Sequence, residues 1–246
     1  RPTIDDTRTR LCALPKIDLH RHLEGSLRLQ TLAEIAQEHE IDLPARAIKD
    51  LRPLVTVGEE EPDFHRFLEK FRVLRRFYPT RGAVERITCE AVADAAEDNV
   101  RYLELRFNPV ALARAQGFPL EAVTRWVCRA VERAQRDYDI HTNLIVQIGR
   151  EETVETAGEL LRVALAHRDA GVVGLDLAGD EERFPASPFR DVFREARDEG
   201  LHVTVHAGEV GSAANVEEAI EDLQAERIGH GVRCVADPHV VELIRE

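Results

Sequence analysis

Two histidines stand two positions apart in the stretch KIDLHRHLEG, residues 16–25, where an alternating pattern ends. The polar and apolar residues from Lys16 to Leu19 alternate, which predicts a strand. Side chains two positions apart on a strand point to the same side, so His20 and His22 would converge on one point. Two neutral imidazoles that converge in this way suit a divalent metal such as zinc. Taken alone, the pair is equally consistent with two ordinary surface or core histidines.

Two more histidines end apolar, strand-like runs later in the chain. His206 ends the run in HVTVHAGE, where Glu209 follows three residues later, and His230 stands between two glycines in RIGHG. The carboxyl ends of parallel strands meet at one edge of an α/β fold, and sites form there. We therefore expect His206 and His230 to lie beside the first pair, with the flanking glycines allowing close backbone approach.

The other histidines are expected to be solvated or structural, because they fall in predicted helices or at strand starts. They are His39, His65, His141, His167, His202 and His239. The stretch DLAGDE gives one more strand end, with Gly179 and Asp180, which is consistent with a site or with an ordinary connecting turn.

Histidines on a metal, with a carboxylic acid and a further imidazole nearby, make up a hydrolytic site. A metal lowers the pKa of bound water from 15.7 to about 7, so that hydroxide forms at neutral pH. A second base then takes a proton from that water, and a protonated carboxyl group donates one to the substrate. Glu209 would need a pKa raised by burial for the second task.

The elements that must position these residues follow a βα order. Six strands are predicted, at residues 16–20, 100–107, 141–149, 171–179, 201–209 and 226–231. Several of them are apolar with little alternation, as in parallel strands covered on both faces, and helix-period segments separate them. Residues 23–99 leave room for several helices, which form an insertion after the first strand and a cap over the site.

One helical segment of this insertion carries a phenylalanine stripe. Phe64, Phe67 and Phe71 share a face of the helix, which predicts either a core-facing surface or an apolar wall of the site.

The polar stretch at residues 1–10 is expected to be a loose lead-in. Gly200 is expected to end a helix, and residues 234–246 to form a turn and the next helix.

Composition excludes several classes of protein. The net charge of −13 over 246 residues disfavours binding to nucleic acid, and no apolar run is long enough for a membrane span. The four cysteines are far apart and lack CxxC spacing, which favours reduced thiols and a cytoplasmic location. Nothing in the sequence specifies an oligomeric state.

Five motifs in order resemble those of the adenosine deaminase family of the metal-dependent amidohydrolase superfamily. They are LPKIDLHRHLEGSLR, LELRFNP, VVGLDLAGDE, HVTVHAGE and RIGHG, and they extend from about residue 14 to residue 232. The resemblance implies a (β/α)8 TIM-type barrel with one catalytic Zn²⁺ per chain. It also implies hydrolytic deamination of adenosine or 2′-deoxyadenosine, a small purine nucleoside, to the inosine counterpart and ammonia.

The resemblance implies a role for each matching residue. His20, His22 and His206 match the histidine ligands of the zinc, Glu209 matches the acid that protonates N1 of the purine, and His230 matches the residue that orients and deprotonates the water. Gly179 matches the glycine whose backbone contacts the purine.

The resemblance also suggests contacts with the sugar and the purine. Glu24 stands where the family has Asp or Glu beside the sugar hydroxyl, which leaves the sugar specificity open. Phe67 and Phe71 would form an apolar wall near the purine, and Asn108, with Arg106, would line the pocket at the end of the second strand.

The match departs from the family after the sixth strand. The family's last zinc ligand is an Asp after the eighth strand, and Asp237 lies in a predicted turn and does not match it. We expect the last two strands and that Asp beyond residue 246 of a longer protein.

Other functions stay open. A related aminopurine, such as adenine or a 5′-modified adenosine like aminodeoxyfutalosine, is an alternative substrate. AMP is less favoured because no cluster of Arg and Lys follows the strands. A purine-binding barrel without catalysis is the alternative outside the enzymes.

Overall fold

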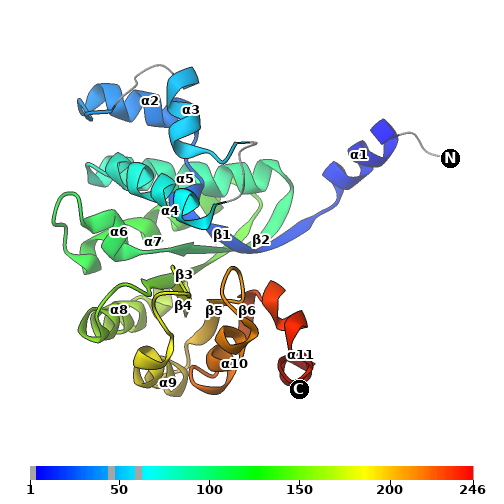
Figure 1. The fold of residues 1–246 in the computed structure, drawn as a ribbon. Coiled ribbons are helices and arrows are strands. Elements are labelled where there is room, and N and C mark those ends of the chain that lie inside the picture. The colour runs from blue at the N-terminus through cyan, green and yellow to red at the C-terminus, as the bar shows by residue number, and fades with distance from the viewer. Residues whose placement is uncertain (1–3, 44–47, 59–62, 246) are drawn as a thin grey trace.

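The computed structural model describes residues 4–43, 48–58 and 63–245, and its centre is one parallel sheet (Figure 1). The sheet has six strands among the described residues, in the order β1-β2-β3-β4-β5-β6. Each predicted strand is present, which confirms the predicted order of strands and helices. The strands are β1 (Lys16–His22), β2 (Val100–Phe107), β3 (His141–Gly149), β4 (Val172–Ala178), β5 (His202–Ala207) and β6 (Arg227–His230).

Helices alternate with the strands from β2 onward, and the sheet curves into a nearly closed barrel of TIM type. The longer helices are α1 (Ile4–Ala13), α2 (Leu29–Glu38), α3 (Ile48–Val55), α4 (Phe64–Leu74), α5 (Arg81–Glu97), α6 (Pro109–Ala113), α7 (Leu120–Asp137), α8 (Val154–Ala166), α9 (Arg190–Asp198), α10 (Ala213–Glu221) and α11 (Pro238–Arg245). Among the described residues, none of these helices combines the length and apolar character that a membrane crossing requires.

The predicted helical insertion is present, since α2, α3, α4 and α5 all lie between β1 and β2. Caps fix where two of these helices begin. The Asp63 side chain accepts hydrogen bonds from the amides of His65 and Arg66 at the start of α4, and the Thr80 hydroxyl accepts one from the Ala83 amide at the start of α5. These caps satisfy amides in the first turn of each helix and fix the residue at which it begins.

The prediction of a loose lead-in was wrong for residues 4–10, which belong to α1 (Ile4–Ala13). This helix projects away from the sheet (Figure 1), and Ile4 and Leu11 are exposed. It has little apolar periodicity because it packs no continuous face on the core, so the sequence pattern gave no helical signal.

The predictions for the two later helix boundaries were confirmed. Gly200 follows α9 with a φ of +85°, a left-handed conformation that glycine adopts without strain. After β6 the chain makes a short 3₁₀ segment, Val232–Ala236, and then enters α11.

A candidate metal and catalytic site at the carboxyl ends of the strands

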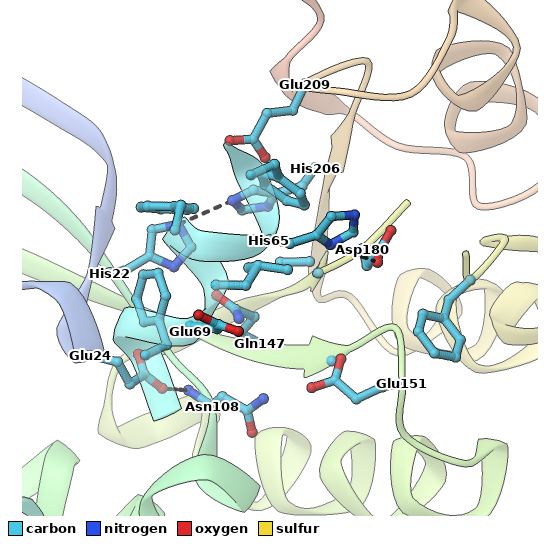
Figure 2. A pocket seen from close by; sticks show the side chains of 18 of the residues that line it. His22, Glu24, His65, Glu69, Asn108, Gln147, Glu151, Asp180, His206 and Glu209 are labelled. Carbon is cyan, nitrogen blue, oxygen red and sulfur yellow. Dashed lines mark hydrogen bonds and ion pairs between the residues drawn. The ribbon is translucent and has the colours of Figure 1, made fainter. Parts of the chain in front are cut away.

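Four histidine rings gather at the end of the barrel where β1, β5 and β6 finish. The His22 and His206 Nε2 atoms lie 3.1 Å apart (Figure 2). The His20 ring centre lies 4.6 Å from that of His206 and 4.9 Å from that of His230. One ligand nitrogen from each of His20, His206 and His230 falls within 4.8 Å of the others. The structure therefore confirms that the histidines at the strand ends converge.

A local irregularity in β1 aims its two histidines. The register of β1 on β2 shifts between Asp18 and Arg21, and the Asp18 carboxylate accepts hydrogen bonds from the His20 amide and from Arg21 Nε. Such bulges recur beside active sites, where they redirect side chains. The His20 and His22 ring centres end 5.3 Å apart, so both imidazoles still face the same cluster.

The glycine before His230 makes room for the cluster. A Cβ atom on Gly229 would lie 2.9 Å from His20 Cε1 and 3.5 Å from His206 Cα, so a larger residue would displace the His20 ring. His230 itself has a φ of +71°, a strained value for a residue with a side chain. The close backbone approach predicted for the glycines in RIGHG is therefore present at Gly229, which lies against His20 and His206.

His20, His22 and His230 are poised in the neutral form that binds a metal. Loss of surrounding solvent, together with the nearby His206, lowers the pKa of His22 to about 3, and burial also lowers the pKa values of His20 and His230. Two nitrogens bound tetrahedrally to one zinc at about 2.1 Å lie about 3.4 Å apart, close to the spacing of the His22 and His206 nitrogens. This all-imidazole donor set fits zinc in charge, distance and chemistry.

A buried carboxylate fixes the His206 ring from behind. Asp176 Oδ1 lies 3.0 Å from His206 Nδ1, and Oδ2 accepts a hydrogen bond from Arg106 Nη1 at 3.0 Å. Burial alone would raise the pKa of Asp176, but its interactions with His206 and with the Arg106 guanidinium outweigh burial and hold that pKa well below its usual range. The ionised carboxylate can only accept, so His206 Nδ1 donates and Nε2 keeps its lone pair for the cluster.

Glu209 lies across the cluster on the loop after β5. One of its carboxylate oxygens is 3.5 Å from His230 Nε2, and the side chain is 27% exposed. Burial raises its pKa, and the negative charge of Glu181 acts in the same direction against the opposing influence of His206. A carboxyl group with a raised pKa retains its proton at higher pH and is suited to act as a general acid.

A cavity of about 720 Å³ opens in front of the histidines. That volume is ample for a small-molecule ligand. Its walls come from the strand ends, from α4 and from the loop after β4. The lining residues are His20, His22, Glu24, Phe64, His65, Phe67, Leu68, Glu69, Phe71, Arg72, Arg75, Asn108, Gln147, Gly149, Glu151, Ala178, Gly179, Asp180, Arg183, Phe184, His206, Glu209 and His230.

Five of the residues predicted to contact a substrate line this cavity, namely Glu24, Phe67, Phe71, Asn108 and Gly179. Glu24 is buried, and its Oε1 accepts the Asn108 amide at 2.6 Å (Figure 2), while its Oε2 is buried with no hydrogen-bond partner in the described part of the chain. Burial raises the pKa of Glu24 to about 7. Phe67 and Phe71 pack edge to face at 5.2 Å between ring centres and face the cavity, so the stripe on α4 forms a cavity wall.

Arg106, by contrast, does not line the cavity as suggested. It is 1% exposed and lies behind the histidines, where it pairs with Asp176 and donates from Nη2 to the Leu19 carbonyl. The buried pair was missed because a charged residue inside an apolar strand gives no local signal of its partner. Asp176 and Arg106 are 70 residues apart in the chain.

Sequence reasoning also missed several polar groups of the cavity. The interpretation of His65 as an ordinary histidine was incomplete, since it lines the cavity and its Nδ1 lies 3.7 Å from Asp180. Arg72, Arg75 and Arg183 line it as well, supplied by the end of α4, the turn after it and the loop after β4. The search for cations at strand ends could not find arginines held by other elements.

Comparisons with known proteins agree with this geometry. The model of the family described as adenosine deaminase matches residues 15–246. An adenosine deaminase from Klebsiella pneumoniae is 41% identical over 234 residues, covering 95% of this chain and 70% of that protein. One from Edwardsiella ictaluri is 39% identical over 232 residues, covering 94% and 69%.

Three solved structures share the fold. An adenine deaminase from Arthrobacter aurescens has 31% identity and a TM-score of 0.84, covering 94% of this chain and 68% of that one. A zinc-bound amidohydrolase from Burkholderia ambifaria has 30% identity and a TM-score of 0.88, covering 98% and 65%. An N6-methyl-AMP deaminase from Arabidopsis thaliana has 30% identity and a TM-score of 0.80, covering 95% and 68%.

Proposed function

The chain belongs to the adenosine deaminase family of aminohydrolases, and we propose that it converts adenosine and 2′-deoxyadenosine to inosine and 2′-deoxyinosine with release of ammonia. The observation that carries the proposal is the meeting of four imidazoles with Glu209 at one wall of the cavity. That arrangement supplies metal ligands, a base and an acid around one position.

We assign the metal ligands to His20, His22 and His206, which would hold one Zn²⁺ per chain. When bound, the zinc supplies a Lewis acid that makes a water molecule acidic enough to ionise near neutral pH. Asp176 contributes by keeping the lone pair of His206 Nε2 directed at the cluster.

We assign proton transfer to Glu209, on the loop after β5, and to His230, at the end of β6. His230, with a lowered pKa, is neutral at pH 7 and can accept the proton of the attacking water. Glu209 donates a proton to N1 of the purine, so that the ring can accept electron density as water adds at C6. The proton held by His230 then passes to the amino group, the bond between C6 and that nitrogen breaks, and ammonia leaves. The hydroxyl on C6 returns its proton to Glu209 and becomes the carbonyl oxygen of the product.

We assign substrate binding to the remaining cavity wall. Phe67 and Phe71 offer an apolar surface to the purine, and the backbone of Gly179, which has a φ of +126°, can approach its edge without an obstructing side chain. The unpartnered Oε2 of Glu24 is placed to accept a sugar hydroxyl, with Asn108 beside it. An unsatisfied buried oxygen favours a ligand that supplies a donor.

The arginines of the cavity support a second candidate. Arg72, Arg75 and Arg183 could pair with a phosphate, and a relative in Arabidopsis thaliana is an N6-methyl-AMP deaminase. Adenine and 5′-modified adenosines also stay candidates, because one relative is an adenine deaminase. Glu69, Glu151 and Asp180 on the same walls add negative charge, which favours an uncharged nucleoside over a nucleotide.

The test is ammonia release by the zinc-loaded full-length protein from a panel of purines. The panel holds adenosine, 2′-deoxyadenosine, adenine, AMP, N6-methyl-AMP and a 5′-extended adenosine. We expect the highest kcat/KM with the first two and none in a Glu209→Gln control. Preference for adenine or for a nucleotide would replace the proposed substrate, and metal-dependent purine binding without ammonia release from any compound would favour a non-catalytic barrel.

We further propose that residues 1–246 act as one barrel domain with the helical insertion at about 23–99, and that the protein works in the cytoplasm. The continuous core that joins the insertion to the strands supports the first point. The free thiols of Cys12, Cys89, Cys128 and Cys234 support the second. The net charge of −13 supports a small-molecule partner over nucleic acid.

A further inference from the structure

A single buried carboxylate collects the backbone amides of the loop that carries Glu209. Glu181, 4% exposed, lies in the loop after β4. Its Oε1 accepts the amides of Glu209 at 2.8 Å, Val210 at 2.8 Å and Gly211 at 2.9 Å, and its Oε2 accepts the amide of Gly208 at 2.8 Å. Four successive N–H groups that converge on an anion form a nest, and each of these hydrogen bonds is strengthened by the charge.

The sequence of the loop is suited to this wrapping. Gly208 has a φ of +67°, and a Cβ atom there would lie 2.6 Å from Val216 Cγ2. A Cβ atom on Gly211 would lie 3.1 Å from the Glu181 carboxyl carbon. The Asn215 side chain, at the start of α10, also donates to the Glu181 carbonyl at 3.1 Å. Both ends of the loop are thus tied to the same residue.

Glu181 does not reach the cavity itself. Its neighbours Gly179 and Asp180 are among the described residues that line the cavity, and Glu181 is not. The loop it holds, however, places the Glu209 carboxylate 3.5 Å from His230 Nε2. Its contribution to the reaction must therefore pass through the position of Glu209.

We propose that Glu181 is a positioning residue, which anchors the 208–211 backbone so that Glu209 meets the purine ring in a reactive geometry. The inference rests on the proposed function, because it assigns Glu209 a proton to deliver. A displacement of about 1 Å in a reacting group can cost about 100-fold in rate. Loss of the anchor should therefore reduce turnover while the histidine cluster, which Glu181 does not contact through any hydrogen bond described here, keeps its metal.

The test compares Glu181→Gln with Glu182→Gln in the zinc-loaded full-length protein. Glutamine has the shape of glutamate but carries no charge, and only one of its two terminal groups can accept. Its NH₂ group therefore leaves either the Gly208 amide or the three amides of residues 209–211 without an acceptor. We expect kcat to fall about 10- to 100-fold, with KM within about three-fold of wild type and zinc content unchanged. Glu182 is exposed and loses the same charge at the adjacent position, so its variant should match the wild type.

A double-mutant cycle separates positioning from general damage. In a Glu209→Gln background, Glu181→Gln should change the residual turnover by less than about two-fold, because the group it positions is already absent. An equal loss in both backgrounds, or a wild-type kcat in the single variant, would overturn the proposal. If Glu181→Gln folds poorly, Glu181→Asp, whose shorter side chain cannot reach all four amides, is measured in its place against the same control.

Hydrogen exchange tests the anchor independently of the reaction. The amides of residues 208–211 should exchange at least about ten-fold faster in Glu181→Gln, while exchange in the preceding strand β5 stays unchanged. Unchanged exchange in these amides would refute the anchor. Failure of the wild-type protein to deaminate any purine would instead count against the proposed function, and the exchange result would stand.

Discussion

Replacement of Asp176 by asparagine would remove the charge that joins Arg106 to His206. Asp176 is 0% exposed and Arg106 1% exposed, so neither can turn to solvent when its partner is lost. An amide keeps one oxygen, but its NH₂ group then faces a donor, either Arg106 Nη1 or His206 Nδ1. Where the NH₂ group faces Arg106, the guanidinium would stay buried with the Leu19 carbonyl as its remaining hydrogen-bond acceptor in the described structure, and in either orientation it loses the opposite charge.

Two magnitudes follow from this geometry. Removal of one partner of a buried ion pair costs about 3–5 kcal/mol in the free energy of unfolding, because the other charge is left uncompensated. Loss of the carboxylate behind a metal-binding histidine typically lowers metal affinity about 10- to 100-fold. We expect both effects in Asp176→Asn, and the first should persist when the metal has been removed.

The measurement is urea unfolding with and without a chelator, together with zinc affinity by competition. Asp139→Asn is the matched control, since Asp139 pairs with Arg101 at 2.9 Å but is 93% exposed. An exposed pair is worth about 0–1 kcal/mol, so the control should differ little from wild type. A loss below about 1 kcal/mol for Asp176→Asn, with unchanged zinc affinity, would refute the claim that this charge orients His206.

The same pair predicts a pH dependence of stability. The pKa of Asp176 is lower in the folded protein than in the unfolded chain, so its contribution is fully present above the unfolded value near 3.9. It is lost as the pH falls through the lower folded value. Below pH 4, wild type should therefore lose its stability advantage over Asp176→Asn progressively, and a constant difference down to the acid-unfolding pH would contradict this linkage.

Three further predictions concern the cavity. Glu209→Gln should retain zinc and lose about 10²- to 10⁴-fold in kcat, and a kcat that is insensitive to the substitution would exclude Glu209 as the acid. In the wild type, turnover should decline as the pH rises through the raised pKa of Glu209. His22→Ala should lower the zinc bound per chain after dialysis, measured by elemental analysis, and full occupancy would show that His22 is not a ligand. Phe71→Ala should raise KM for adenosine by about ten-fold through lost apolar contact, with a smaller change in kcat; an unchanged KM would place the purine elsewhere in the cavity.

The strands and the histidine cluster were predictable because their signals are local. Buried parallel strands are apolar on both faces, and functional residues at their carboxyl ends are brought together by the fold without further information. His20, His22, His206 and His230 needed no more than this rule. The bulge at Asp18 changed the path of β1 but left the rings facing one another.

The side chains that support the site from outside could not be predicted, because their signals are not local. Asp176 and Glu181 act through partners that lie 27 to 70 residues away, and a single carboxylate in or after a strand carries no mark of such a partner. The cavity arginines and His65 come from the insertion and from a loop, where their orientation depends on packing. The helix at residues 4–13 lacks an apolar face against the core, so periodicity could not reveal it.

The wall formed by α4 has a consequence for how this protein can be altered. The metal cluster and both proton-transfer groups belong to strands and the loops that follow them, whereas Phe64, Phe67 and Phe71 belong to a separately capped helix. The reaction chemistry and the apolar wall that would face the purine are thus encoded in different stretches of the gene. Randomising residues 64–72 should therefore yield variants with new purine preferences that retain their zinc and their hydrolytic machinery.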